Sequence, residues 1–199
     1  MSSLFGPTIA TQPPDALPTG EKRARGAYYT PDALARAITR TLGDIIAPPM
    51  GILEPGCGGG AFLRAAHDEW RRASLLGIDL VPACDGPGRV LTGDLFKLQD
   101  SVELVLGNPD FGIAEKVMRH GMKLLPWGGH LAFLLRTSFL SSSGRVELYR
   151  EFPLRYLQPI GQRPCFTGDG KTDPMEYALF VWQQGFTGRG EILPPLVWR

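Results

Sequence analysis

Residues 51–60 read GILEPGCGGG, in which a short apolar run leads into a glycine-rich loop. An apolar run of this length, bounded by glycine and proline, is typical of a buried strand. Glycine lets the backbone turn tightly and approach a ligand closely. In open parallel sheets, ligands bind beyond the carboxyl ends of the strands. The stretch therefore predicts a strand that carries a ligand-binding loop at its carboxyl end.

Strand and helix signals alternate along the rest of the chain. Strands are predicted at 51–54, 75–79, 90–92, 102–106, 131–135, 157–160 and 177–182, and helices at 31–47, 60–73, 113–125 and 144–152. The first helix is expected to begin with Thr30 as N-cap and Pro31 in its first turn. Nearly continuous apolar runs favour a mainly parallel sheet with helices on both faces. Only the loop 161–175 joins the last two strands, which favours an antiparallel pair there.

The bulk properties fit one soluble domain. The chain has 199 residues and a net charge of +1, and no apolar run approaches the roughly 20 residues of a membrane helix. Cys57, Cys84 and Cys165 form no CxxC pair and lack the spacing of a zinc site, so no metal is expected. We expect a flexible arm over 1–26, a single domain over 27–199 and a cytoplasmic location.

Two acidic residues follow later strands. Asp79 ends the strand after the glycine loop, where a carboxylate can accept both hydrogen bonds of a ribose diol. Asp94 follows the third strand and either accepts a hydrogen bond from an adenine amino group or simply caps a turn. Leu95 and Phe96 come next, and either side chain is suited to lie against the adenine ring. The glycine loop and Asp79 together predict a nucleoside-type cofactor.

A second motif, Asn108-Pro109-Asp110-Phe111, follows the strand predicted at 102–106. The lone pair of an amino group on an aromatic ring is delocalised, so an enzyme that methylates it needs acceptors for both N–H groups. The Asn108 side chain offers one oxygen, and the Pro109 carbonyl offers another. Phe111 offers a flat face for base stacking, worth about 1–3 kcal/mol.

With these motifs in this order, the chain resembles the N6-adenine DNA methyltransferases whose cofactor motif precedes the catalytic motif. Residues 26–31 resemble the family's N-terminal cofactor motif, 54–60 its glycine motif, 108–111 its catalytic Asn-Pro-Pro-Tyr/Phe motif, and 163–168 a later motif whose aromatic helps hold the base. The resemblance covers about residues 26–182. It implies a Rossmann-like, seven-stranded class I fold with one antiparallel strand near the C-terminus, and S-adenosyl-L-methionine as cofactor.

The resemblance also implies site residues. Those implied for catalysis are Asn108, Pro109, Asp110 and Phe111. Those implied for cofactor binding are Tyr28, Tyr29, Thr30, Glu54, Pro55, Gly56, Cys57, Gly58, Gly60, Phe62, Asp79, Leu80, Asp94, Leu95 and Asn108. Those expected to contact substrate are Phe111, Phe166, Arg163 and Lys171. Glu54 is expected to point from its strand into the ligand crevice.

The chain departs from the family pattern in two respects. Asp110 stands where the family has proline, so the loop should be looser. The carboxylate either repels DNA phosphate or helps to remove the proton, and a weakened enzyme is a further alternative. No insertion exceeds a loop, so the chain resembles a small bacterial or phage form without a large target-recognition region. We therefore expect relaxed sequence preference or a partner chain.

The sequence leaves open which kind of molecule carries the target nitrogen. The same type of motif serves enzymes that methylate RNA or a protein glutamine amide, and a cofactor- or nucleic-acid-binding module is a further alternative. Residues 20–40 and 136–171 each contain more Arg and Lys than Asp and Glu, which fits contacts with phosphates. An ordinary solvent-exposed surface can have the same charge distribution. Methylation of cytosine carbon is disfavoured because no cysteine follows proline in a catalytic loop. DNA adenine is the preferred substrate.

Overall fold

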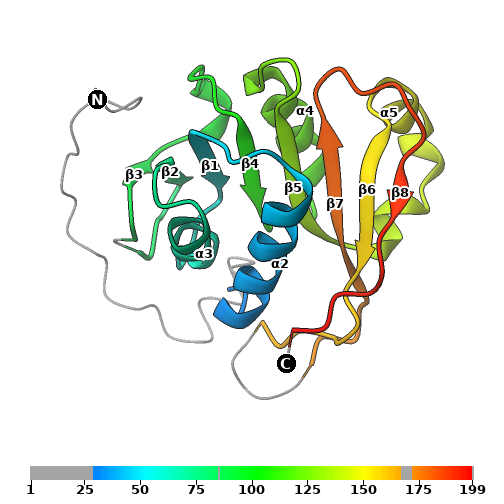
Figure 1. Cartoon of the computed structure of the whole chain (residues 1–199), viewed down its shortest axis with the longest axis horizontal. Coiled ribbons are helices and arrows are strands. Elements are labelled where there is room, and N and C mark those ends of the chain that lie inside the picture. Colours follow the sequence, from blue (N-terminus) through cyan, green and yellow to red (C-terminus); the bar gives the residue numbers. More distant parts are fainter. Residues whose placement is uncertain (1–28, 85, 167–171, 199) are drawn as a thin grey trace.

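The computed structural model describes residues 29–84, 86–166 and 172–198. Its elements are α2 (Asp32–Ile45), β1 (Gly51–Pro55), α3 (Ala61–Glu69), β2 (Ser74–Asp79), β3 (Arg89–Thr92), η1 (Leu95–Lys97), β4 (Leu104–Gly107), α4 (Ala114–Leu124), β5 (His130–Arg136), η2 (Thr137–Leu140), η3 (Ser143–Arg145), α5 (Val146–Glu151), β6 (Leu154–Pro159), β7 (Tyr177–Gln183) and β8 (Glu191–Ile192). Figure 1 shows these elements arranged around one central sheet.

The strands form one eight-stranded sheet in the order β3-β2-β1-β4-β5-β7-β6-β8. β1 to β5 pair in parallel, whereas β7 runs antiparallel to both β5 and β6. In Figure 1 the orange β7 lies between β5 and the yellow β6. The predicted class I fold, with a mostly parallel sheet and one antiparallel strand near the C-terminus, is confirmed.

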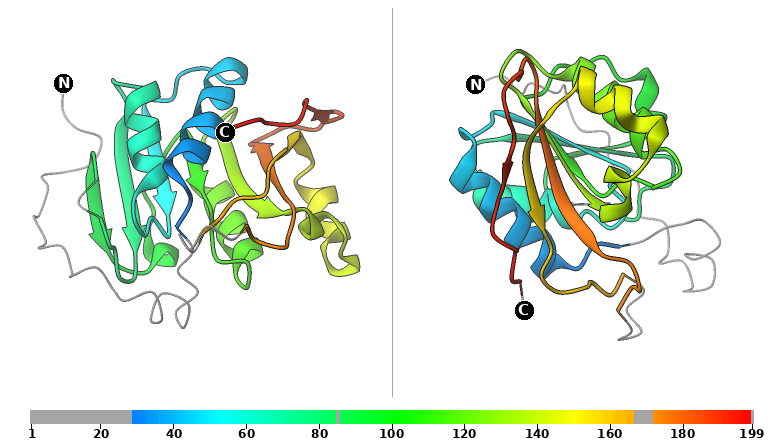
Figure 2. Two further views of the ribbon diagram at one scale, coloured as in Figure 1. Left: turned by 90° about the horizontal axis from the view of Figure 1, so that it is seen from below. Right: turned by 90° about the vertical axis from the view of Figure 1, so that its right-hand side faces the viewer.

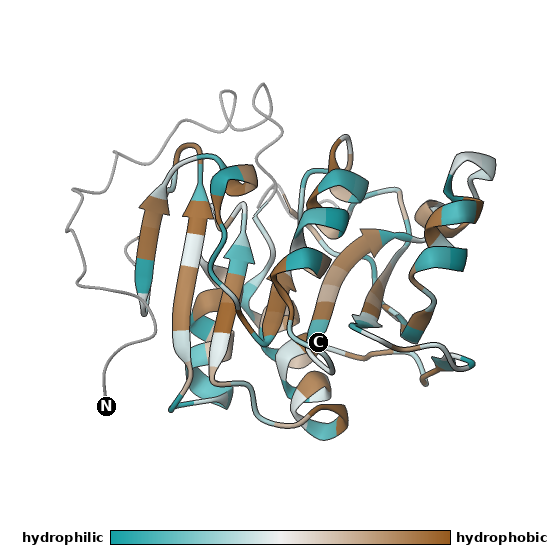
Figure 3. Cartoon of the chain, turned by 90° about the horizontal axis from the view of Figure 1, so that it is seen from above, coloured by the Kyte–Doolittle hydropathy of each residue, from teal (hydrophilic) through white to brown (hydrophobic). Residues whose placement is uncertain are grey.

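Helices cover both faces of the sheet. Alternate residues of each strand point to opposite faces, so Ile52 packs with α2 and α3 while its neighbour Leu53 packs with α4. Figure 2 shows α2 and α5 on opposite sides of the sheet. The central strands β1, β4, β5 and β7 are buried on both faces and are mostly apolar, and brown predominates in the sheet of Figure 3.

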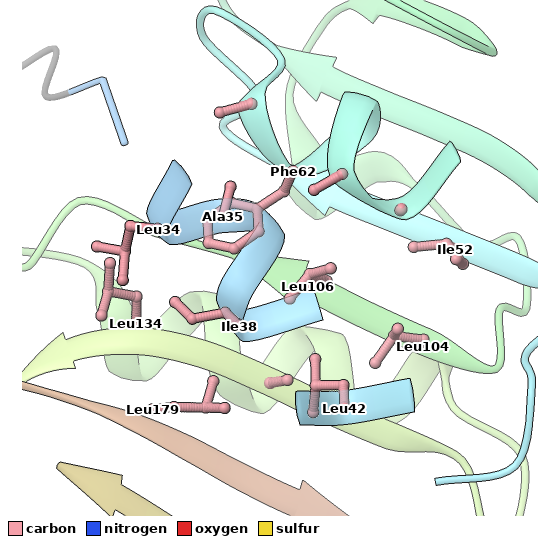
Figure 4. Close-up of a cluster of buried hydrophobic side chains, with 14 of the residues drawn as sticks. Leu34, Ala35, Ile38, Leu42, Ile52, Phe62, Leu104, Leu106, Leu134 and Leu179 are labelled. Atoms are coloured by element: carbon pink, nitrogen blue, oxygen red, sulfur yellow. The ribbon is translucent and has the colours of Figure 1, made fainter. Parts of the chain in front are cut away.

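The core beneath α2 fixes this helix on the sheet. Leu34, Ile38 and Leu42 lie one helical turn apart and are fully buried. They pack with strand residues such as Leu104 and Leu179 (Figure 4). Burial of such a leucine stabilises the fold by about 1.5–3 kcal/mol. α2 is thereby anchored so that the residues just before it, Tyr29 and Thr30, reach the glycine loop and the end of β4.

The structure corrects some local predictions. The N-cap of α2 is Pro31, whose carbonyl accepts the first helical hydrogen bond, and the Thr30 hydroxyl is used elsewhere. An eighth strand, β8, was not predicted; it adds a two-residue parallel pairing to β6. Within the described ranges, no helix has the length and apolar content to span a bilayer. The arm expected over residues 1–26 lies outside the described residues.

Candidate functional site

The predicted cofactor and catalytic residues gather at one edge of the sheet. β1, β2, β3 and β4 are neighbours and run parallel, so their carboxyl ends meet there. Glu54, Asp79, Asp94 and Asn108 each lie at or just after one of these ends. The topology therefore brings together segments that lie far apart in sequence, in the crevice where open α/β sheets bind ligands.

The glycine loop has a backbone that other residues rarely adopt. Gly56, Gly58 and Gly60 have φ angles of 63°, 44° and 71°. A Cβ added at Gly56 would meet no atom within 4 Å, so open space lies beside this part of the loop. A Cβ at Gly58 would lie 3.1 Å from the Tyr29 ring, which places Tyr29 against the loop.

Asp79 braces the glycine loop. One carboxylate oxygen accepts the Gly58 N–H at 2.9 Å, and the other accepts the Val81 N–H at 2.9 Å. Each carboxylate oxygen can accept more than one hydrogen bond, so these bonds leave capacity for a ribose diol. Leu80, which lies between Asp79 and Val81 in the sequence, is 71% exposed, and its apolar side chain is available to a ligand.

The Glu54 side chain is bonded to the start of α3. It is 5% exposed, and its carboxylate accepts the Leu63 N–H at 2.9 Å near the start of α3. Gly60, the N-cap of that helix, has no side chain to satisfy the first free N–H groups, so Glu54 does so from β1. Burial raises the pKa of Glu54 well above its ordinary value. In this structure the Glu54 carboxylate therefore faces the start of α3, and its contact with a cofactor stays a prediction.

The remaining predicted cofactor residues divide into buried and accessible groups. Phe62 and Cys57 are 1% and 3% exposed and lie in the core, so their side chains present almost no surface to a ligand. Pro55 is also buried. Asp94 caps η1 by accepting the Phe96 N–H at 3.0 Å, and Leu95 is half-buried beside it. The cap interpretation of Asp94 is correct, while its contact with adenine stays a prediction. Tyr28 lies outside the described residues.

A cysteine that the sequence did not single out lies against the loop. Cys84 is so close to Gly60 that a Cβ added there would be 2.8 Å from its sulfur. The hydrogen bond to Cys84, together with burial, raises the pKa of Cys57. The same hydrogen bond lowers the pKa of Cys84 to about 6. The pair therefore holds a protonated thiol beside an ionisable one.

Asn108 is held by a residue near the beginning of the described chain. Its side-chain nitrogen donates to the Thr30 hydroxyl at 3.2 Å, and Thr30 is 9% exposed. Its side-chain oxygen is buried and, among the described residues, has no hydrogen-bond partner. A buried polar atom without a partner is uncommon in native structures. The amide is thus anchored at its nitrogen, and its oxygen keeps unused capacity to accept a hydrogen bond.

The rest of the catalytic motif forms a turn. Pro109 is buried, while Asp110 is exposed and accepts the Gly112 N–H through its carboxylate at 2.7 Å. Phe111 is half-buried, with the Arg136 guanidinium 4.4 Å from its ring centre and the Tyr177 ring 5.9 Å away. Arg136 ends β5 at the same sheet edge. Its place at a strand's carboxyl end was the one signal that could have identified it.

Besides Phe111, the structure describes two of the three other predicted substrate residues, Phe166 and Arg163. Phe166 is 6% exposed and packs edge-to-face on Tyr177 with ring centres 5.1 Å apart, so in this conformation it presents little surface to a base. Arg163 is exposed, and its guanidinium donates to the Pro174 carbonyl at 3.4 Å. Lys171 lies outside the described residues.

Sequence comparison finds relatives among the type II methyltransferases. No family model matches the chain. It is 29% identical to Type II methyltransferase M.TthHB8I of Thermus thermophilus, over 91% of this chain and 56% of that protein. The chain is thus similar to a type II methyltransferase over almost its whole length. It spans little more than half the length of this methyltransferase relative.

Solved methyltransferases share the fold. A type I restriction-modification methyltransferase subunit of Streptococcus thermophilus superposes with a TM-score of 0.63 at 15% identity, covering 84% of this chain and 47% of that one. The 23S rRNA methyltransferase ErmE superposes with a TM-score of 0.57 at 15% identity, covering 81% and 71%. The cofactor implied by these relationships is S-adenosyl-L-methionine. The open space at Gly56 and the spare acceptors of Asp79 fit such a group.

Proposed function

We propose that this chain transfers a methyl group from S-adenosylmethionine to the N6 amino group of adenine in DNA. The observation that carries the proposal is the Asn108 amide, anchored through its nitrogen to Thr30 and without a partner at its buried oxygen. An acceptor oxygen held in this way, at the carboxyl end of a strand beside β1 and its glycine loop, suits a ligand N–H group. It has the place and polarity that a target amine requires.

The chemistry assigns a task to each group of the motif. The bound cofactor supplies a methyl group already activated on a positively charged sulfur. The Asn108 oxygen accepts one N–H of the amine, and the Pro109 carbonyl accepts the other. Both acceptors draw the nitrogen lone pair out of conjugation with the ring and stabilise the positive charge that develops on nitrogen. Phe111 supports the flat base, and fixed positioning of the amine contributes further to the rate.

Phe111 does not present a bare face in this structure. The Arg136 guanidinium lies 4.4 Å from its ring centre, where a cation is attracted to the ring electrons. A base that stacks on this face takes the place of the guanidinium, which then lies beside the substrate backbone. Arg136 thereby becomes a candidate phosphate contact, together with Arg163.

DNA is preferred as the carrier because the relative M.TthHB8I is named a type II methyltransferase and one structural neighbour belongs to a type I restriction-modification system. RNA is the second candidate, since ErmE, a 23S rRNA methyltransferase, has the same fold. A protein glutamine amide has the same planar N–H geometry and is the third. We also propose relaxed sequence preference on DNA, or recognition supplied by a partner chain.

Transfer of labelled methyl to DNA, RNA and protein extract in parallel tests the proposal. We expect label in DNA, with single strands methylated at least as well as duplex because no base has to be flipped out of a stack. Asn108→Ala should lower kcat by about a hundredfold or more and leave cofactor affinity nearly unchanged. Gln184→Ala is the matched control, since it deletes an amide beyond β7 at the opposite sheet edge. Label confined to RNA or protein would overturn the DNA assignment.

A further inference from the structure

Asp110 closes the turn that follows Pro109. Its carboxylate accepts the Gly112 N–H at 2.7 Å, and its main-chain carbonyl accepts the Ile113 N–H at 3.1 Å. The Ile113 carbonyl in turn accepts the Val117 N–H, the first hydrogen bond of α4. Side-chain and main-chain bonds from one residue therefore join the catalytic motif directly to a helix that is packed on the sheet.

This turn decides where Phe111 lies. Phe111 is the second residue of the turn, and its ring touches both buried clusters as well as Arg136 and Tyr177. A change in the turn would move the ring relative to the Asn108 oxygen and the Pro109 carbonyl, which lie only a few residues away. The geometry of all three target-contacting groups therefore depends on the shape of residues 110–113.

A proline in this position would stiffen the chain by fixing φ through its ring. Aspartate has no such restraint, but a side-chain acceptor bonded to a main-chain N–H two residues later restrains a turn as well. Resting on the proposed function, we infer that Asp110 is a positioning residue that restrains the catalytic turn through its hydrogen bond to Gly112. Its negative charge has no part in the chemistry.

Two other roles would make Asp110 act through its charge, namely proton removal and repulsion of phosphate. Substitutions distinguish these two charge-dependent roles from a role in restraining the turn. Asp110→Asn keeps a side-chain oxygen that can accept from Gly112 but removes the charge. Asp110→Ala removes both. Asp100→Ala is the matched control, because Asp100 is also exposed but lies before β4, towards the opposite sheet edge.

The experiment combines kcat on a DNA oligonucleotide with hydrogen exchange at the Gly112 amide. Asp110→Asn should keep kcat within about twofold of the wild type and keep the Gly112 amide protected. Asp110→Ala should lower kcat about tenfold, the loss expected for one hydrogen bond, and expose the amide to exchange. Asp100→Ala should change neither quantity. Calorimetry with S-adenosylmethionine should give the same Kd for all four proteins.

Three results would overturn the inference: an Asp110→Asn enzyme as slow as Asp110→Ala, an Asp110→Ala enzyme as fast as the wild type, or equal Gly112 exchange in all variants. Failure of the proposed function would look different, since the wild type itself would methylate no DNA. In that case the exchange measurement still decides whether Asp110 restrains the turn.

Discussion

The side-chain nitrogen of Asn108 donates to the hydroxyl of Thr30 across 3.2 Å and a sequence separation of 78 residues. The bond joins the segment that precedes α2 to the carboxyl end of β4. A primary amide can rotate by half a turn and exchange the positions of its oxygen and nitrogen. A partner that accepts a hydrogen bond from the nitrogen therefore fixes the position of the oxygen. Thr30 therefore couples the N-terminal segment to the proposed catalytic oxygen.

Thr30→Val should lower kcat about tenfold, because valine keeps the shape but not the hydroxyl that holds the amide. Thr30→Ser keeps the hydroxyl and should stay near the wild-type rate. Steady-state kcat and the Kd for S-adenosylmethionine should be measured on both variants. If Thr30→Val weakens cofactor binding and leaves kcat intact, Thr30 acts on the cofactor and not on Asn108.

Asp79→Ala should weaken binding of S-adenosylmethionine at least tenfold. The variant loses the proposed ribose acceptor and also the bond that braces the glycine loop at Gly58. Isothermal titration calorimetry measures the effect directly. Asp68→Ala, which removes an exposed carboxylate from α3, is the control and should bind like the wild type. Unchanged binding by Asp79→Ala would contradict the cofactor assignment.

Glu54→Gln should stabilise the protein at neutral pH. Burial raises the pKa of Glu54, so the folded state holds its proton at pH values where the unfolded state has released it. The free energy of unfolding contributed by this group therefore falls as pH rises above the ordinary glutamate pKa of about 4.3. Glutamine keeps an oxygen for the Leu63 N–H and does not titrate.

The prediction for Glu54 is checked by urea unfolding at pH 4 and pH 8. Glu54→Gln should exceed the wild type in free energy of unfolding at pH 8, and the difference should shrink at pH 4. Parallel pH profiles of the two proteins would show that the buried carboxyl group does not contribute to the pH dependence.

Cys84 should be alkylated faster than Cys165 at pH 7. The thiolate is the reactive form, and the hydrogen bond from Cys57 lowers the pKa of Cys84. Cys57→Ala removes the donor and should slow alkylation of Cys84, whereas Cys57→Ser keeps a donor and should preserve the rate. Mass spectrometry after timed iodoacetamide treatment reports each site separately. Equal rates at Cys84 and Cys165 would refute the assigned hydrogen bond.

The sequence predicted the architecture well because apolar runs and glycine positions are local signals. All seven long strands were located, and the parallel arrangement that follows from them brought Asp79 and Asn108 to one edge. β8 was missed because two residues carry no periodicity. The partners of Thr30 and Glu54 could not be predicted, since they depend on how α2 and α3 dock on the sheet. The Arg136 contact with Phe111 likewise requires the register of β5 against β4.

The position of β7 has a consequence for how the protein is made. β7 lies between β5 and β6 although it follows both in the chain. During synthesis, β1 to β4 can pair as soon as residue 107 has emerged, so the cofactor half of the sheet is available early. Tyr177 is the first residue of β7, and its ring contacts the rings of both Phe111 and Phe166. A nascent chain can therefore pair the strands that carry the glycine loop, Asp79 and Asn108 before β7 is made, whereas the contacts of Phe111 and Phe166 with Tyr177 form only afterwards.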